Sequence, residues 1–468
     1  MKIFNTLSGQ KENLPENRPL RLFVCGPTVY NYAHIGNART YVSFDNFVSY
    51  LRSRGIKVSY LQNITDVDDK IIKRGLEESV SPMEIAGKYE KIYHEDEKSL
   101  KIDSVNKYAR ATDHIPEIIK QIQILIEKGH AYKIENEGYY YDISTFKEYG
   151  KLSKRTAEQA EDATSRIDEG VNKKNKGDFA LWKFPKSEVG GNKNGKSFAI
   201  INGEPIWNTP LGWGRPGWHI EDTAITEKYF GPQYDIHGGA VDLKFPHHEA
   251  EIAQQEAASG KKPLVKIWMH TGFLLFGEEK MSKSSGKFVS IRDFLKMYSA
   301  DIFRYIIASH NYRSPINYTD QLAIEAGKNI NSIIEFLTKI SLVKKSGTPQ
   351  IDIAKYEKSF IDSLDDDFNT PKALSVIFDL INEANLKIQS ITKKDAVSAK
   401  KYIAEKLGLF KVSVKMPRIP LKIRLLAWRR KLLRNNKQFA KSDLLRKKIE
   451  ALGYKIDDTP LGTIILKS

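Results

Sequence analysis

The sequence predicts an α/β fold: a doubly wound parallel sheet split by an insertion, followed by a helical bundle and a small basic C-terminal domain. Three observations support this prediction. Strand-like and helix-like runs alternate over about residues 19–112, as in parallel strands joined by crossover helices. Helical periodicity dominates residues 315–410. Residues 411–468 carry 16 Lys or Arg and 4 Asp or Glu, a net charge of +12.

The first half of the sheet begins with a buried strand at residues 21–25, followed by a turn and a helix-like run over 38–54. Residues 57–64 have the composition of a second strand. In doubly wound sheets, ligands bind at the carboxyl ends of the strands. Cys25 and Thr65 fall at those ends, so we expect them to line a ligand-binding crevice.

Residues 113–205 differ from the preceding block in composition and in their pattern of expected elements, and we interpret them as an insertion. They contain a helix near 116–128, a strand near 139–142 and charged, glycine-rich stretches. These stretches lack a preceding strand and a following helix, so we expect flexible connections rather than phosphate-binding loops. The sheet is then expected to resume over residues 206–262 and to complete a Rossmann-like domain with residues 1–112.

The remaining chain divides into a segment with a lysine-rich loop at 263–314, the helical bundle at 315–410 and the basic domain at 411–468. At 468 residues the chain is too long for a single core. Its one cysteine excludes an intrachain disulfide. No apolar run approaches the roughly 18 residues that span a bilayer, and no signal-peptide pattern is present. We therefore expect a cytoplasmic protein.

The net charge of +16 suggests an acidic partner. Most of it lies in residues 411–468, which leaves about +4 for the other 410 residues. A solvated surface that only aids solubility is the simpler alternative. A tail this basic favours contact with phosphates, and its affinity for nucleic acid is expected to fall steeply with salt.

One motif with phosphate chemistry is Lys280-Met281-Ser282-Lys283-Ser284. Two ammonium groups on long stems, three residues apart, suit the negative charge that develops on a leaving pyrophosphate. On its own, such a run is as easily a solvated loop.

A second motif, His34-Ile35-Gly36-Asn37, lies between the first strand and the first helix. The start of a helix favours a phosphate because of its free N–H groups and its dipole. His34 and Asn37 can donate to phosphate oxygens, and Gly36 lets an adenosine lie against the backbone. A helix cap or a core histidine is the alternative interpretation.

With the His34–Asn37 motif before the lysine motif in the chain, the two resemble the signatures of class I aminoacyl-tRNA synthetases. Asparagine at position 37 is typical of cysteinyl-tRNA synthetases. Further blocks that match the family lie at residues 25–30, 63–70, 178–183, 214–221 and 245–249. The resemblance therefore extends over most of the chain.

The resemblance implies an enzyme that activates L-cysteine with ATP and Mg²⁺ to cysteinyl-adenylate, then transfers cysteine to the 3′-terminal ribose of tRNA(Cys). It implies that catalysis and ATP binding depend on His34, Asn37, Lys280 and Lys283, with Gly36 also binding ATP.

The resemblance also implies contacts between the bound cysteine and Gly26, Thr65 and Trp218. We expect His219 and His237 to line the pocket or to orient ligands. The insertion would lie near the acceptor end of the tRNA and the segment 263–314 near its stem. The basic domain would bind the anticodon, and the protein would act as a monomer.

Recognition of cysteine requires more than shape. A pocket that senses only shape would separate cysteine from serine by about 10–200-fold, whereas zinc prefers a thiolate to a hydroxyl. The family holds zinc with two cysteines, a histidine and a glutamate. Cys25, His247 and Glu251 match three of these ligands, and His247 and Glu251 would share one helical face.

Asp222 stands where the family has its second cysteine. Two interpretations remain open. Asp222 ligates the zinc through oxygen, or the site is weakened, empty or occupied by a different divalent metal, because oxygen is a harder ligand. Two alternative functions also remain: a paralogous ligase that gives cysteine to a small amino sugar, and an inactive RNA-binding homologue.

Overall fold

The computed structural model describes residues 1–15, 17–155, 172–186, 197–277, 279–280 and 288–467, with only the backbone described at 279–280. The chain forms two compact units. The first comprises Met1–Ala300, Asn311–Tyr318 and Asp366–Phe368. The second comprises Asp301–His310, Thr319–Asp365 and Asn369–Ser468.

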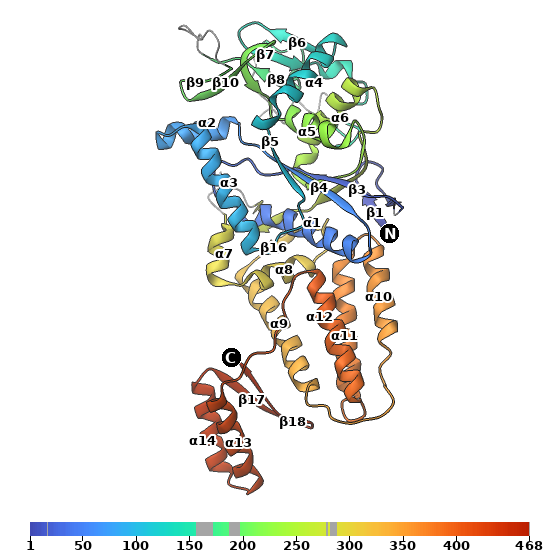
Figure 1. Cartoon of the computed structure of the whole chain (residues 1–468), viewed down its shortest axis with the longest axis vertical. Coiled ribbons are helices and arrows are strands. Elements are labelled where there is room, and N and C mark those ends of the chain that lie inside the picture. The colour runs from blue at the N-terminus through green and yellow to red at the C-terminus, as the bar shows by residue number, and fades with distance from the viewer. Residues whose placement is uncertain (16, 156–171, 187–196, 278, 281–287, 468) are drawn as a thin grey trace. The chain divides into compact units, whose positions relative to one another are not determined.

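The first unit is built on a five-stranded sheet in the order β13-β12-β3-β4-β5, in which all neighbours are parallel (Figure 1). The strands are β3 (Leu20–Val24), β4 (Val58–Ile64), β5 (Lys107–Arg110), β12 (Tyr234–Ala240) and β13 (Val265–Thr271). The sheet confirms the predicted α/β class. Because β3 pairs with β4 on one side and β12 on the other, the strand order reverses beside β3, which is where doubly wound sheets bind ligands.

Helix α1 (Ile35–Ser53) connects β3 to β4 and is buried over most of its surface. Its weakly amphipathic sequence fits this position, because a helix covered on several sides does not need a polar face. The chain continues through α2 (Asp69–Glu78) and α3 (Pro82–Ser99) to β5. The N-terminal hairpin, β1 (Lys2–Asn5) and β2 (Gln10–Asn13), packs beside β13.

A second sheet of six strands, in the order β6-β7-β8-β11-β10-β9, forms the insertion. Its strands are β6 (Ala131–Ile134), β7 (Gly138–Tyr141), β8 (Phe179–Lys183), β9 (Phe198–Ile201), β10 (Glu204–Thr209) and β11 (Gly212–Pro216). The boundary that we expected after residue 205 falls inside β10, and the parallel sheet resumes only at β12. The hairpin turn between β10 and β11 explains this, because Gly212 adopts φ +94° and folds β11 back onto β10 and β8.

Three packed helices, α4 (Ile115–Glu127), α5 (Ile220–Phe230) and α6 (His247–Ser259), lie beside the parallel sheet. Short 3-10 helices occur at Thr112–His114, Ile143–Thr145 and Val241–Lys244. A small sheet contains β14 (Leu274–Phe276), β15 (Glu279–Lys280) and β16 (Ile316–Tyr318), and α7 (Ile291–Met297) follows β15 in the chain.

The second unit contains the predicted helical region. Its long helices are α9 (Asp320–Ile340), α10 (Ile353–Asp365), α11 (Thr370–Leu386) and α12 (Lys393–Leu409), preceded by α8 (Ala300–Ala308). The C-terminal part consists of α13 (Leu421–Asn435), α14 (Phe439–Ala451) and the hairpin β17 (Tyr454–Thr459) and β18 (Gly462–Lys467). Buried Arg430 joins α13 to this hairpin through two hydrogen bonds to Asp458. Among the described residues, no helix is long and apolar enough to cross a membrane.

Candidate active site

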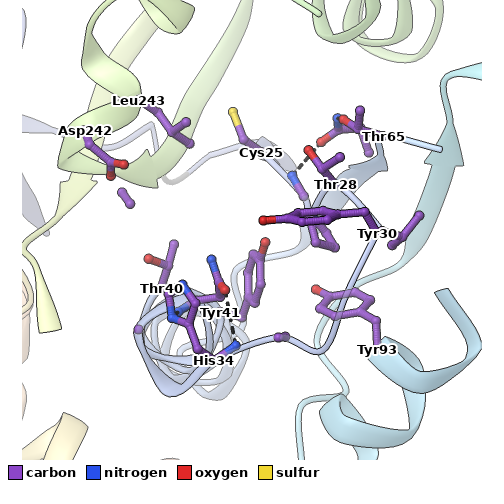
Figure 2. A pocket seen from close by; sticks show the side chains of 18 of the residues that line it. Cys25, Thr28, Tyr30, His34, Thr40, Tyr41, Thr65, Tyr93, Asp242 and Leu243 are labelled. Atoms are coloured by element: carbon purple, nitrogen blue, oxygen red, sulfur yellow. Dashed lines mark hydrogen bonds between the residues drawn. The ribbon is translucent and has the colours of Figure 1, made fainter. Parts of the chain in front are cut away.

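A cavity of about 430 Å³ opens at the carboxyl ends of β3 and β4, beside the point where the strand order reverses. Many of the predicted site residues line it: Cys25, Gly26, His34, Gly36, Asn37, Thr65, Trp218, Asp222 and His247. Figure 2 shows the sulfur of Cys25 across the cavity from His34 and Tyr41. Residues that follow β3 and β4 and residues of α1, α5 and α6 therefore meet at one place.

The wall formed by the start of α1 is organised by its own side chains. His34 is the N-cap, and its Nδ1 accepts a hydrogen bond from the Asn37 N–H at 3.2 Å. The Asn37 side-chain oxygen accepts in return from the His34 N–H at 3.3 Å. Because Nδ1 is an acceptor, the neutral His34 ring carries its proton on Nε2. Capping and phosphate binding are thus compatible roles for this motif.

Two glycines allow close approaches at this wall. A Cβ atom on Gly26 would lie 1.7 Å from the Asn63 carbonyl oxygen, so only glycine fits between β3 and β4. A Cβ atom on Gly36 would lie 2.8 Å from the His34 ring and would displace it. Glycine at position 36 therefore permits the observed position of the His34 imidazole.

Thr65 is held by a buried carboxylate that the sequence analysis did not single out. Its hydroxyl donates to Glu221 Oε1, and Asn63 Nδ2 donates to the same oxygen at 3.2 Å. Burial raises the pKa of Glu221 well above its usual value, and the charge of neighbouring Asp222 raises it further. Glu221 therefore holds the side chains of Thr65 and Asn63 in position on one side of the cavity.

A cluster of six buried ligand-type side chains, which we call the floor, lies at the base of the cavity, and Cys25, Asp222 and His247 of this cluster line the cavity. Cys25 Sγ lies 3.2 Å from His237 Nε2, 3.1 Å from His248 Nε2 and 4.0 Å from Glu251 Oε1. His247 Nε2 lies 3.0 Å from Asp222 Oδ2 and 3.2 Å from Glu251 Oε1. All six side chains are at most 5% exposed.

These residues form two overlapping groups in which the potential ligand atoms lie within 4.8 Å of one another. One group is Cys25, Asp222, His247 and Glu251, and the other is Cys25, His237, His248 and Glu251. Among the described residues, Asp222 Oδ1 and Glu251 Oε2 are buried without a hydrogen bond, although Glu251 Oε2 lies 3.5 Å from His237 Nδ1. A bound cation would remove the penalty of burying these carboxylates. The cluster is therefore compatible with a zinc site.

The electrostatics of the floor fit the same interpretation. Burial raises the pKa of the Cys25 thiol, and the charges of Glu251 and Asp222 raise it further. Burial also lowers the pKa of His237 and His248, so both rings are neutral, which is the form that ligates metals.

In each imidazole of the floor, Nδ1 lies within hydrogen-bond distance of another side chain. His247 Nδ1 lies 2.8 Å from His219 Nδ1, and the Trp218 ring stacks on His247 with a centroid distance of 4.3 Å. His237 Nδ1 lies 2.6 Å from the Tyr234 hydroxyl. Such contacts orient metal-ligating histidines. His219 thus contacts a candidate ligand, and Trp218 lines the cavity and stacks on the same imidazole.

His248 and its neighbour His270 were missed by the sequence analysis, although His248 stands in a matched block. His248 precedes Glu251 by three residues, so both share a face of α6. That spacing was a signal that the sequence contained. The contact of His248 with Cys25 could not be predicted from the sequence, because the two residues lie 223 positions apart in the chain.

The lysine motif is only partly described. Lys280 is the last residue of β15, which pairs with β14. The Lys280 side chain and the whole of Lys283 lie outside the described residues. Their proposed part in ATP binding therefore stays a prediction from the sequence.

A family model described as the catalytic domain of tRNA synthetases class I (C) matches residues 11–329, and a model of the DALR domain matches residues 359–411. Fold and site thus define a class I aminoacyl-tRNA synthetase. The cysteine--tRNA ligase of Thermococcus onnurineus is 40% identical over 489 residues, covering 99% of this chain and 98% of its own length. That of Thermoplasma volcanium is 41% identical over 469 residues, covering 98% of each chain. The chain belongs to the cysteine--tRNA ligase family.

Solved structures of other synthetases share the fold. Mycobacterium tuberculosis methionyl-tRNA synthetase bound by methionyl-adenylate aligns with a TM-score of 0.59 and 14% identity, covering 84% of this chain and 90% of its own. A leucyl-tRNA synthetase from Agrobacterium radiobacter, in a ternary complex with tRNA, gives 0.60 and 9%, covering 84% and 83%. At such low identity the likeness concerns the fold alone.

Proposed function

We propose that the chain joins L-cysteine to tRNA(Cys) in two steps, with ATP and Mg²⁺ consumed in the first. The observation that carries this proposal is the composition of one cavity. The phosphate-binding start of α1 lies on one side, and a buried thiol, imidazole and carboxylate cluster forms the floor. A candidate nucleotide site and a candidate sulfur-selective site thus line one cavity, which supports the proposal.

In the first step, a carboxylate oxygen of cysteine attacks the α-phosphorus of ATP in line. A new P–O bond forms as the bond to the β-phosphate oxygen breaks, and pyrophosphate leaves with the electron pair. His34, through Nε2–H, and Asn37 donate to phosphate oxygens at the start of α1. Lys280 and Lys283 are assigned to the charge that develops on pyrophosphate.

For selection of cysteine, we assign zinc to Cys25, Asp222, His247 and Glu251. Asp222 Oδ1 is buried without a hydrogen bond, which supports an oxygen ligand at the position where the family has a thiolate. When bound, the metal supplies a Lewis acid that prefers a thiolate to a hydroxyl. Gly26, Thr65 and Trp218 line the space above the floor and are assigned to the rest of the amino acid.

In the second step, a hydroxyl of the terminal ribose attacks the cysteinyl carbonyl, and AMP leaves. We assign residues 113–205 to the acceptor end, 263–314 to the stem and 411–468 to the anticodon. The net charge of +12 in the last of these segments supports contact with phosphates. From family membership we also propose that the protein acts as a cytoplasmic monomer.

Pyrophosphate exchange and tRNA charging test the proposal together. We expect exchange that depends on cysteine and is weak with serine, and charging of tRNA(Cys). Exchange without charging, but with transfer of cysteine to an amino sugar, would identify the paralogous ligase instead. RNA binding without exchange would identify an inactive homologue.

The tRNA-binding surface has its own test. Arg429 and Lys431 are exposed on α13. Replacement of both by glutamate should lower charging about tenfold or more at moderate salt and leave exchange unchanged. An equal loss of both activities would argue against tRNA binding by this domain.

A further inference from the structure

The floor of the cavity contains two sets of four potential metal ligands that share Cys25 and Glu251. We call Cys25, Asp222, His247 and Glu251 the outer set, and Cys25, His237, His248 and Glu251 the inner set. Asp222 and His247 line the cavity, whereas His237 and His248 do not. The two sets thus differ in whether a metal that they hold would face the substrate.

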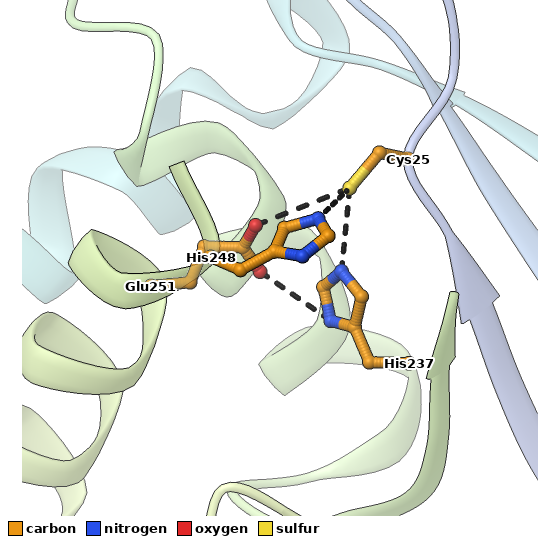
Figure 3. A group of neighbouring side chains, drawn as sticks. All are labelled: Cys25, His237, His248 and Glu251. Atoms are coloured by element: carbon orange, nitrogen blue, oxygen red, sulfur yellow. Dashed lines mark hydrogen bonds and ion pairs between the residues drawn. The ribbon is translucent and has the colours of Figure 1, made fainter. Parts of the chain in front are cut away.

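The inner set is close to the geometry of a bound metal. Figure 3 shows the four side chains converging, with His237 on β12, His248 and Glu251 on α6, and Cys25 just after β3. The sulfur lies 3.2 and 3.1 Å from the two Nε2 atoms and 4.0 Å from Glu251 Oε1. Ligand atoms around a tetrahedral zinc lie roughly 3.3–3.8 Å apart, given its bond lengths. Small side-chain movements would therefore suffice.

The inner imidazoles are also oriented for ligation. The Tyr234 hydroxyl lies 2.6 Å from His237 Nδ1. His248 Nδ1 lies 2.9 Å from His270 Nε2, and His270 Nδ1 lies 2.9 Å from the Thr6 hydroxyl. With the protons on Nδ1, His248 donates to His270, which in turn donates to Thr6. Both Nε2 atoms then present lone pairs toward Cys25.

The composition of the two sets favours the inner one in this chain. With Asp222 in place of a thiolate, the outer set offers one sulfur, one nitrogen and two carboxylates. The inner set offers one sulfur, two nitrogens and one carboxylate. Zinc binds well to nitrogen and sulfur, and harder oxygen ligands suit harder metals. The only cysteine of the chain belongs to both sets.

We propose that the inner set is a second zinc-binding position and holds the metal while no cysteine is bound. Four protein ligands then surround the metal on the side away from the cavity. The outer set holds it when a substrate thiol is present. This inference rests on the proposed zinc and not on tRNA charging.

The number of imidazoles bound to zinc tests the proposal without any variant. X-ray absorption at the zinc edge of the full-length protein, loaded with one zinc and free of substrate, should show two imidazoles and one sulfur. One imidazole with more oxygen would identify the outer set and overturn the proposal. Failure to bind zinc would overturn it as well.

A matched pair of substitutions gives an independent test, because neither removes a ligand. His270 orients His248 of the inner set, whereas His219 orients His247 of the outer set. In competition with a chelator, His270→Gln should weaken zinc binding about tenfold or more, and His219→Gln much less. The reverse order would contradict the proposal. Circular dichroism checks both folds.

The proposed function and this inference can fail separately. A protein that binds zinc through two imidazoles but shows no cysteine-dependent exchange would refute the function alone. A protein that charges tRNA(Cys) while its substrate-free zinc has one imidazole would refute the inner position alone.

Discussion

Two groups of buried carboxylates in the first unit, one on α3 and one at the floor of the cavity, differ in whether an arginine side chain pairs with them. On α3, Glu90 accepts two hydrogen bonds of 2.9 Å from Arg110, and Glu97 contacts His94 at 3.0 Å. Burial alone would raise the pKa of Glu90, yet hydrogen bonds from His94 and Arg110 hold it below its usual value. Glu90 is therefore balanced by its own neighbours, although Glu97 Oε1, like Asp222 Oδ1, is buried without a hydrogen bond.

The floor of the cavity has no such balance. Burial raises the pKa of Glu251 well above its usual value, and the charges of Asp222 and Glu221 raise it further. Among the described residues, no Lys or Arg forms an ion pair with Glu221, Asp222 or Glu251. A bound metal would offset the cost of burying charged carboxylates at this place. This difference supports structural roles for the charges of α3 and the proposed metal-binding role for the carboxyl groups of the floor.

Loss of Cys25 should have the largest effect, because both ligand sets share its sulfur. In Cys25→Ala we expect the zinc content to fall to background and cysteine-dependent pyrophosphate exchange to fall by about 10³-fold or more. Metal analysis and exchange assays measure these changes. Full zinc content in the variant would show that the floor does not hold the metal through this thiol.

Removal of zinc should have the next largest effect, on stability. Chelation should lower the melting temperature by roughly 5–10 °C, since a ligand present at about 1,000 times its Kd stabilises by about 4 kcal/mol. Calorimetry with and without chelator measures the difference. Cys25→Ala serves as the control and should not respond, and an unchanged wild-type transition would contradict the contrast with α3.

Glu90→Gln should have a moderate effect on stability and none on zinc. The substitution removes a charge that His94 and Arg110 contact, so we expect a loss of about 1 kcal/mol in the free energy of unfolding. Urea denaturation and metal analysis measure the two quantities. A loss of zinc in this variant would mean that the two groups are coupled.

The smallest predicted effect is the pH dependence contributed by His94. Hydrogen bonds from His94 to Glu90 and Glu97 raise the pKa of His94 to about 9 in the folded protein. Its stabilisation is therefore fully present below about pH 6.5, the unfolded value, and is lost as pH rises through 9. Because this side chain is 38% exposed, the contribution should stay below about 1 kcal/mol.

Urea denaturation of wild type and His94→Gln at pH 6 and pH 10 measures this contribution. The difference between the two proteins should be visible at pH 6 and absent at pH 10. An equal difference at both values would show that His94 acts through packing and not through charge.

The sequence by itself determined the fold class and the local motifs. Alternating runs predicted the parallel sheet, and the His34–Asn37 motif was placed correctly at the start of a helix because strand, turn and cap signals are local. The i, i+4 spacing placed His247 and Glu251 on one helical face for the same reason.

Only the tertiary structure decided which side chains meet Cys25. His237 and His248 lie 212 and 223 residues away in the chain. Their contact with the sulfur follows from the insertion of β3 between β12 and β4 and from the packing of α6 beside the sheet. No local period encodes strand order, so the sequence predicted one set of ligands and the fold revealed two.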